Sequence, residues 1–74
     1  MTHEQLINIV MERTNSKLIK KRIQRTVVGM RVSVTVSSVT EAKAVQLALK
    51  TMGAWALKRE GSKVTCVMDE TVSL

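Results

Sequence analysis

The chain has 74 residues, enough for a single domain that buries only about 60% of the surface of its unfolded form. Its single cysteine excludes an internal disulfide, and no cluster of Cys, His and carboxylate residues offers a metal site. Twelve basic residues against six acidic ones give a net charge of +6, which suits phosphate, an acidic protein or an anionic surface as partner.

The first predicted element is a helix over about residues 3–14. Thr2 and Gln5 have the spacing of a capping box, in which each residue satisfies a backbone donor of the other. Apolar residues then recur at i, i+3 and i+4 from Ile7, as on one face of a helix. Asn15 tolerates the left-handed conformation that ends many helices, so it fits the C-terminal stop.

Residues 16–25 fit two structures. Ile19 and Ile23 are spaced for a helix, whereas Ile19, Lys21 and Ile23 also alternate as in a strand. Local pattern alone leaves this segment open.

The most regular alternation in the chain lies between Val27 and Ser37. Even positions from Val28 to Val36 are apolar and mostly valine, and odd positions from Arg31 are polar. Because successive side chains of a strand point to opposite faces, this pattern predicts a central strand with one face in the core and one in water.

A second helix is predicted over about residues 40–52. Ser38 and Glu41 repeat the capping-box spacing, with Thr40 as an alternative cap, and Gly53 is a natural stop. Two alternating runs split by E-G-S then indicate a β-hairpin.

A shift of the chain by 38 residues aligns similar residue types, among them the two helix stops and the two apolar helical faces. It indicates two helix–strand–strand units, residues 2–38 and 40–70, within one domain of residues 1–74. Residues 17–24 are therefore assigned to a strand, and residues 71–74 are expected to fray. The predicted fold is α+β, α-β-β-α-β-β, with a four-stranded, mainly antiparallel sheet and two helices on one face, an order that is also a circular permutation of the ferredoxin-like plan.

Few residues offer catalytic chemistry. His3 lies in the first turn of a helix and has no partner histidine nearby in the sequence. Cys66 is in phase with Val64 and Met68, as expected for a small buried hydrophobe rather than a nucleophile. The glycines are scattered and form no phosphate-binding loop. We predict that the protein is not an enzyme and uses no cofactor or metal.

The strongest functional signal is the segment 13–31, which contains no acidic residue. Its basic residues are Arg13, Lys17, Lys20, Lys21, Arg22, Arg25 and Arg31. We predict that they bind the phosphate backbone of a nucleic acid, DNA or RNA. A charged, solvated sheet edge is the alternative interpretation of the same residues. The alternative function is a protein–protein module, an inhibitor or adaptor that docks an acidic surface or a sheet edge of its partner.

Trp55 is the only aromatic residue, so single-strand binding through stacked bases is not expected and a duplex is favoured. We expect Trp55 in the core under the second helix, with an interface position as the alternative. Ser33 and Thr35 belong to the polar row of the central strand, where water or a second subunit would cover them.

The small core and the absence of a disulfide favour a homo-oligomer. The start of the chain lacks the features of a secretory signal, and no stretch approaches the roughly 20 apolar residues of a membrane helix. We therefore expect a cytoplasmic protein without membrane contact.

Overall fold

The computed structural model describes residues 1–71 and contains two helices and four strands in the predicted order. The elements are α1 (His3–Arg13), β1 (Leu18–Thr26), β2 (Gly29–Val36), α2 (Val39–Thr51), β3 (Trp55–Glu60) and β4 (Lys63–Met68). The ambiguous segment is thus a strand, β1. Of the tail 71–74 that is expected to fray, residues 72–74 lie outside the described residues.

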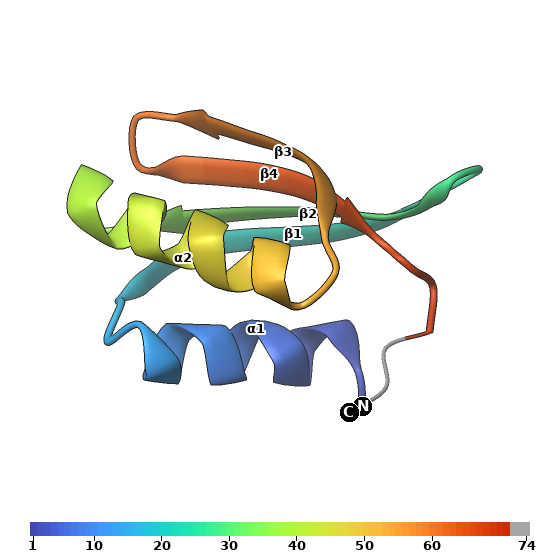
Figure 1. Cartoon of the computed structure of the whole chain (residues 1–74), viewed down its shortest axis with the longest axis horizontal. Coiled ribbons are helices and arrows are strands. Elements are labelled where there is room, and N and C mark those ends of the chain that lie inside the picture. The colour runs from blue at the N-terminus through green and yellow to red at the C-terminus, as the bar shows by residue number, and fades with distance from the viewer. Residues whose placement is uncertain (72–74) are drawn as a thin grey trace.

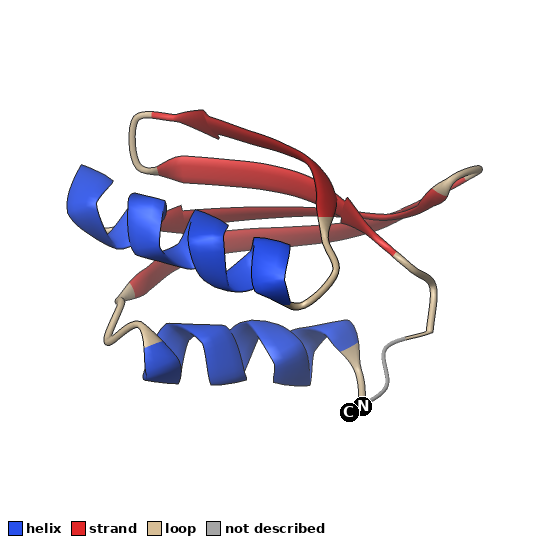
Figure 2. Cartoon of the chain, viewed as in Figure 1, coloured by secondary structure: helices blue, strands red, loops and turns tan. Residues whose placement is uncertain are grey.

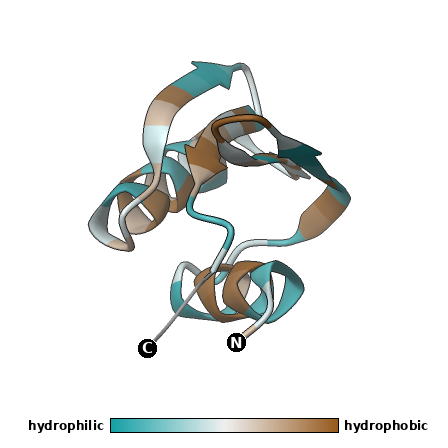
Figure 3. Cartoon of the chain, turned by 90° about the vertical axis from the view of Figure 1, so that its right-hand side faces the viewer, coloured by the Kyte–Doolittle hydropathy of each residue, from teal (hydrophilic) through white to brown (hydrophobic). Residues whose placement is uncertain are grey.

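The four strands form one sheet in the order β1-β2-β4-β3, and every neighbouring pair is antiparallel. Both helices lie on the same side of this sheet (Figures 1 and 2). The view at right angles in Figure 3 shows the same arrangement. Among the described residues, no helix covers the other face, which confirms the predicted α+β architecture.

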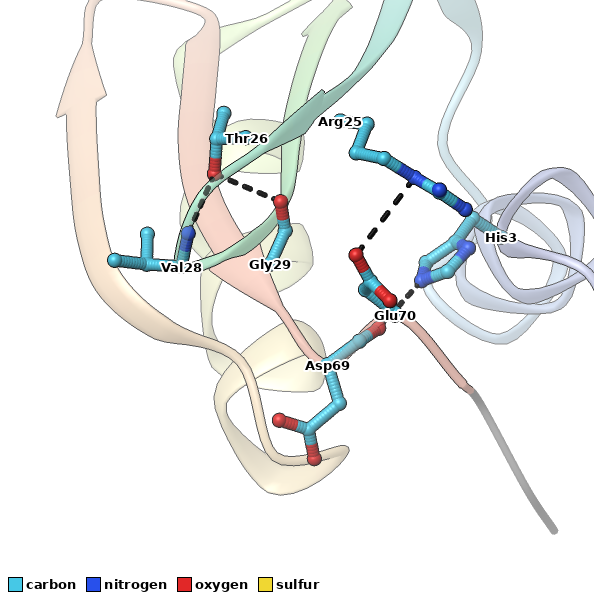
Figure 4. A network of polar contacts seen from close by, with 7 residues as sticks. All are labelled: His3, Arg25, Thr26, Val28, Gly29, Asp69 and Glu70. Atoms are coloured by element: carbon cyan, nitrogen blue, oxygen red, sulfur yellow. Dashed lines mark hydrogen bonds and ion pairs between the residues drawn. The ribbon is translucent and has the colours of Figure 1, made fainter.

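The strand order is the one that results when the ferredoxin-like β-α-β-β-α-β plan is circularly permuted. β2, α2 and β3 form a split β-α-β unit, because β4 lies between the two strands. β4, α1 and β1 would form the second such unit if the chain ends were joined, since β2 lies between these strands. His3 Nε2 donates a hydrogen bond to the carbonyl of Asp69 (2.8 Å), which holds the start of α1 beside the end of β4 (Figure 4).

The helices begin at caps that the sequence predicts. Gln5 N–H donates to Thr2 Oγ1 (3.1 Å), and Thr2 N–H donates to Gln5 Oε1 (2.8 Å), a complete capping box. At α2 the cap is Ser38 rather than Thr40, and its hydroxyl accepts from Glu41 N–H (3.2 Å). Each cap satisfies a backbone donor that the first turn of a helix leaves free.

Both helices end at a residue in the left-handed conformation. Asn15 has φ +51° and follows α1, while Gly53 has φ +93° and follows α2. In each case the next residue donates its N–H back to a carbonyl of the last turn, Ser16 to Met11 (2.9 Å) and Ala54 to Leu49 (3.0 Å). Asn15 and Gly53 are 38 residues apart, the same spacing at which the two halves of the sequence align.

The core lies between the helices and the inner face of the sheet. Its fully buried side chains are mostly branched aliphatic residues: Leu6, Ile7, Val10, Val32, Val34, Val36, Val45, Leu49, Val64 and Cys66. Within residues 1–71, no polar or charged side chain is buried. Burial raises the pKa of the Cys66 thiol to about 11, so this residue is the small buried hydrophobe that its phase predicts.

The central strand is shorter than predicted. β2 begins at Gly29, and Val27 and Val28 form the turn after β1, with exposed fractions of 103% and 65%. The sequence alternation runs through Val28, but the chain must reverse between the two strands. The Thr26 hydroxyl donates to the Gly29 carbonyl (2.7 Å) and closes this turn (Figure 4). The prediction that Val28 faces the core is therefore wrong.

Candidate functional site

The face of the sheet opposite the helices consists of three cross-strand rows. Residues that pair directly across antiparallel strands share a face, so the register assigns each row. The rows are Lys20–Thr35–Lys63–Glu60, Arg22–Ser33–Thr65–Lys58 and Gln24–Arg31–Val67–Trp55. We call these twelve residues the open sheet face.

The open sheet face is strongly positive. Five of its residues are basic and exposed: Lys20, Arg22, Arg31, Lys58 and Lys63. Its one acidic residue, Glu60, lies 3.3 Å from the Lys58 ammonium. The face thus carries a net +4, and the chain's other five acidic residues lie on the helices or after β4.

Short hydroxyl side chains form the floor between these cations. Ser33 and Thr65 lie at the bottom of a depression of about 200 Å³, with arginine and lysine side chains around it. Thr35 and Ser33 line a second depression of about 290 Å³ toward the first row. Because the floor is low and the surrounding side chains are long, an anionic group on the sheet would meet cations from several sides.

Trp55 lies on the open sheet face, directly opposite Val67, and 40% of its surface is exposed. The expectation of a core position under α2 is therefore wrong. Strict alternation would put Trp55 on the same face as Leu57, which packs against the core. Instead β3 contains an irregularity between Trp55 and Lys58, where Ala56 has φ +52°, and this extra residue turns Trp55 to the other side.

The chain has no match among protein-family models, curated proteins or solved structures. Within residues 1–71, neither helix is long and apolar enough to cross a membrane. The function must therefore be inferred from the residues of the open sheet face themselves.

The structure divides the basic segment 13–31 among three places. Lys20, Arg22 and Arg31 lie on the open sheet face, together with Ser33 and Thr35. The two other cations of β1 alternate to its reverse side, where Lys21 pairs with Val34 and Arg25 with Met30. Arg13 belongs to the last turn of α1, and Lys17 to the loop that follows it. The seven predicted residues thus do not form one surface.

Two residues of the basic segment away from the open sheet face make local contacts, Arg25 through its side chain and Lys17 through its backbone. Arg25 Nε lies 3.7 Å from Glu70 Oε1, an exposed ion pair beside the His3–Asp69 contact (Figure 4). The backbone N–H of Lys17 donates to Glu41 Oε1 (2.6 Å), which ties the loop after α1 to the first turn of α2. These contacts stabilise the join between elements rather than a ligand surface.

Sequence reasoning missed two cations of the open sheet face, Lys58 and Lys63. Lys63 alternates in phase with Thr65, so its position on the polar face of β4 is visible in the sequence. That this face continues the polar face of β2 depends on the pairing of Thr35 with Lys63 and Ser33 with Thr65. No local sequence pattern predicts that β2 pairs with β4, because the two strands are far apart in the chain.

Proposed function

We propose that the protein binds nucleic acid by contacting phosphate groups with the open sheet face. One observation carries this proposal: five cations from all four strands share one face of the sheet with three hydroxyl side chains and a single acidic residue. The sequence alone suggests a basic segment of β1 and its flanks, whereas the folded chain presents a two-dimensional array.

The residue types suit phosphate. Arginine offers a planar fork for bidentate hydrogen bonds, lysine a compact positive charge, and serine and threonine hydroxyls donate to phosphate oxygens. Neighbouring strands lie about 4.8 Å apart and residues on one face of a strand about 7 Å apart. The array therefore spans roughly 15 Å in each direction, room for several phosphates of one strand.

The same charges argue against the other occupants considered. A second copy docked face to face would place +4 against +4, and like charges across an interface are unfavourable. The buried centres of protein–protein interfaces are depleted in charged residues, whereas the centre of this face holds hydroxyls and cations. Strand addition to β1 meets an edge that has a bulge near Leu18 and a run of charged residues, features that discourage pairing.

The test is fluorescence anisotropy of labelled single-stranded and duplex DNA and RNA at several salt concentrations. Two variants with equal net charge locate the binding surface. The open-face variant carries Lys20→Gln, Arg22→Gln and Arg31→Gln. The control variant carries Arg13→Gln, Lys17→Gln and Lys21→Gln, all away from the open sheet face.

We expect the wild-type protein to show a slope of log K against log salt of about −2 to −4.5, corresponding to three to five neutralised phosphates. The open-face variant should reduce that slope by about 2 units, and the control variant should change it little. If the two variants change binding equally, binding depends on the net charge of the protein and not on the open sheet face. Absence of binding to every nucleic acid at low salt would overturn the proposal and leave an acidic protein as the partner to seek.

A further inference from the structure

The open sheet face has one apolar corner, formed by Trp55 and Val67 at the end of the third row. Val67 points away from the core but is only 9% exposed, while Trp55 is 40% exposed. An indole half open to solvent at the edge of a net +4 surface presents an aromatic surface next to phosphate-binding groups. In most of the chain, large apolar side chains instead pack between the helices and the sheet.

The backbone of β3 holds Trp55 in this position. Ala56 adopts φ +52°, a conformation that residues other than glycine adopt rarely, and the register shifts between Trp55 and Lys58. The shift lets Leu57 pack against the core while Trp55 faces the cations. A regular strand would bring both residues to the same side.

Two cations of the open sheet face flank this corner. Lys58 occupies the next open-face position along β3, about 7 Å from Trp55, and Arg31 lies two strands away, about 10 Å. Both have long, flexible side chains that extend over such distances. A base resting on the indole would leave its neighbouring phosphates within reach of both.

We propose that the open sheet face binds single-stranded nucleic acid, with a base stacked on Trp55 and the flanking phosphates held by Arg31 and Lys58. This inference rests on the proposed function and adds the strand type and the base contact to it. Stacking requires a base whose face is free, and in a duplex neighbouring base pairs cover that face. The sequence favours a duplex because Trp55 is the only aromatic residue, but the exposed indole on the open sheet face offers one surface on which a base can stack.

Because Trp55 is the only tryptophan, intrinsic fluorescence reports on it alone. The probes are an oligothymidylate of about 12 nucleotides, the duplex formed with its complement, and an abasic sugar–phosphate chain of the same length. We expect the single strand to quench the tryptophan fluorescence strongly. The duplex and the abasic chain should bind with little quenching, because they offer charge without a free base.

Variants then measure the stacking contribution by anisotropy of the labelled probes. Trp55→Ala should weaken single-strand binding about five- to a hundredfold, leave abasic-chain binding unchanged, and keep a wild-type circular dichroism spectrum. Trp55→Phe retains an aromatic ring and should lose less. Leu47→Ala removes an apolar side chain of α2 that is 64% exposed on the helix side, and it should change neither affinity.

Two results would overturn the inference, and they are distinguishable. If the single strand binds but the fluorescence stays constant and Trp55→Ala binds equally well, base stacking is excluded while phosphate binding by the open sheet face stands. If no nucleic acid binds, the proposed function fails and the stacking contact fails with it.

Discussion

Gly29 is the residue whose replacement the fold tolerates least at the turn between β1 and β2. It has φ +144°, and a Cβ at this position would lie 2.5 Å from the carbonyl oxygen of Met68 in the neighbouring strand. Both the backbone conformation and the close approach of β4 therefore require glycine. The exposed valines of the turn have no such constraint.

We expect Gly29→Ala to lower the free energy of unfolding by about 1–3 kcal/mol, because the chain must either adopt a strained φ or move β4. Urea unfolding followed by circular dichroism measures the change. Gly61→Ala is the matched control, since Gly61 has φ +59° with nothing within 4 Å of the added Cβ. Gly61→Ala should lower the free energy of unfolding by about 1 kcal/mol, from the strained backbone conformation alone. If both variants lose the same free energy, the close contact of the Cβ at residue 29 with Met68 adds no cost.

Glu41 is the residue that joins the two α-β-β units at the start of α2. The Ser37 hydroxyl and then the backbone N–H of Lys17 hold the pKa of its carboxylate below the ordinary value of 4.5. A carboxylate with a lowered pKa stabilises the fold above its unfolded pKa, and this contribution disappears as pH falls through the folded value.

The difference in unfolding free energy between the wild type and Glu41→Gln should therefore be largest near pH 7 and shrink in acid. Urea unfolding at neutral pH and at about pH 3 measures it, below the ordinary pKa of a glutamate. Taking the difference between the two proteins removes the common effect of the other acidic residues. A difference that stays constant with pH would show that the pKa of Glu41 is the same in the folded and the unfolded chain, so that these hydrogen bonds do not favour the carboxylate.

At the scale of the elements, the irregularity in β3 decides which side chains reach the open sheet face. Ala56 occupies the left-handed conformation that the irregularity requires. As a result, Trp55 lies on the open sheet face and Leu57 packs against the core on the other face.

We expect Ala56→Val to destabilise the protein by about 1–2 kcal/mol, because a β-branched residue is a genuine outlier at positive φ. Ala56→Gly should be neutral or stabilising by up to about 1 kcal/mol, since glycine adopts this conformation without a Cβ penalty. Urea unfolding compares the two variants. If Ala56→Val is as stable as the wild type, the backbone at residue 56 is not held in the left-handed region.

At the scale of the whole molecule, charge is divided between the two sides of the sheet. The open sheet face carries +4, and the remainder of the chain carries +2 because five acidic residues accompany its seven basic ones. The helices and the neighbourhood of the chain ends hold those acids. Under the proposed function, this distribution of charge would steer a polyanion to the open sheet face.

The topology also makes a prediction about chain connectivity. A variant that starts at Ser62, ends at Gly61 and joins Leu74 to Met1 by a short glycine-rich linker has the order β-α-β-β-α-β. We expect it to fold with a wild-type circular dichroism spectrum and cooperative urea unfolding, because the His3–Asp69 hydrogen bond already holds the joined regions together.

A permuted chain opened between Ser33 and Val34 is the control. This cut divides β2, which pairs on both sides within the sheet, and should prevent folding. Failure of the first permuted chain with correct folding of the second would contradict the topology described here.

The sequence by itself determines most of the elements of this protein. The caps at Thr2 and Ser38, the stops at Asn15 and Gly53 and the alternation along β2 are local features, because backbone sterics and hydrogen bonding act within a few residues. The buried phase of Cys66 follows from the same alternation. The alternation wrongly extends the strand through Val27 and Val28, because alternation does not reveal where a chain reverses.

Only the tertiary structure decided the candidate site. Lys20 and Lys63 share a row because burial of the valines of β2 and β4 sets the pairing of strands that are distant in sequence. Trp55 lies on that face because Ala56, with a positive φ, makes β3 irregular. The alternation of residue types in the sequence does not predict such an irregularity. The basic segment of the sequence consequently supplies three of the five cations on the open sheet face, and long-range strand pairing supplies the other two.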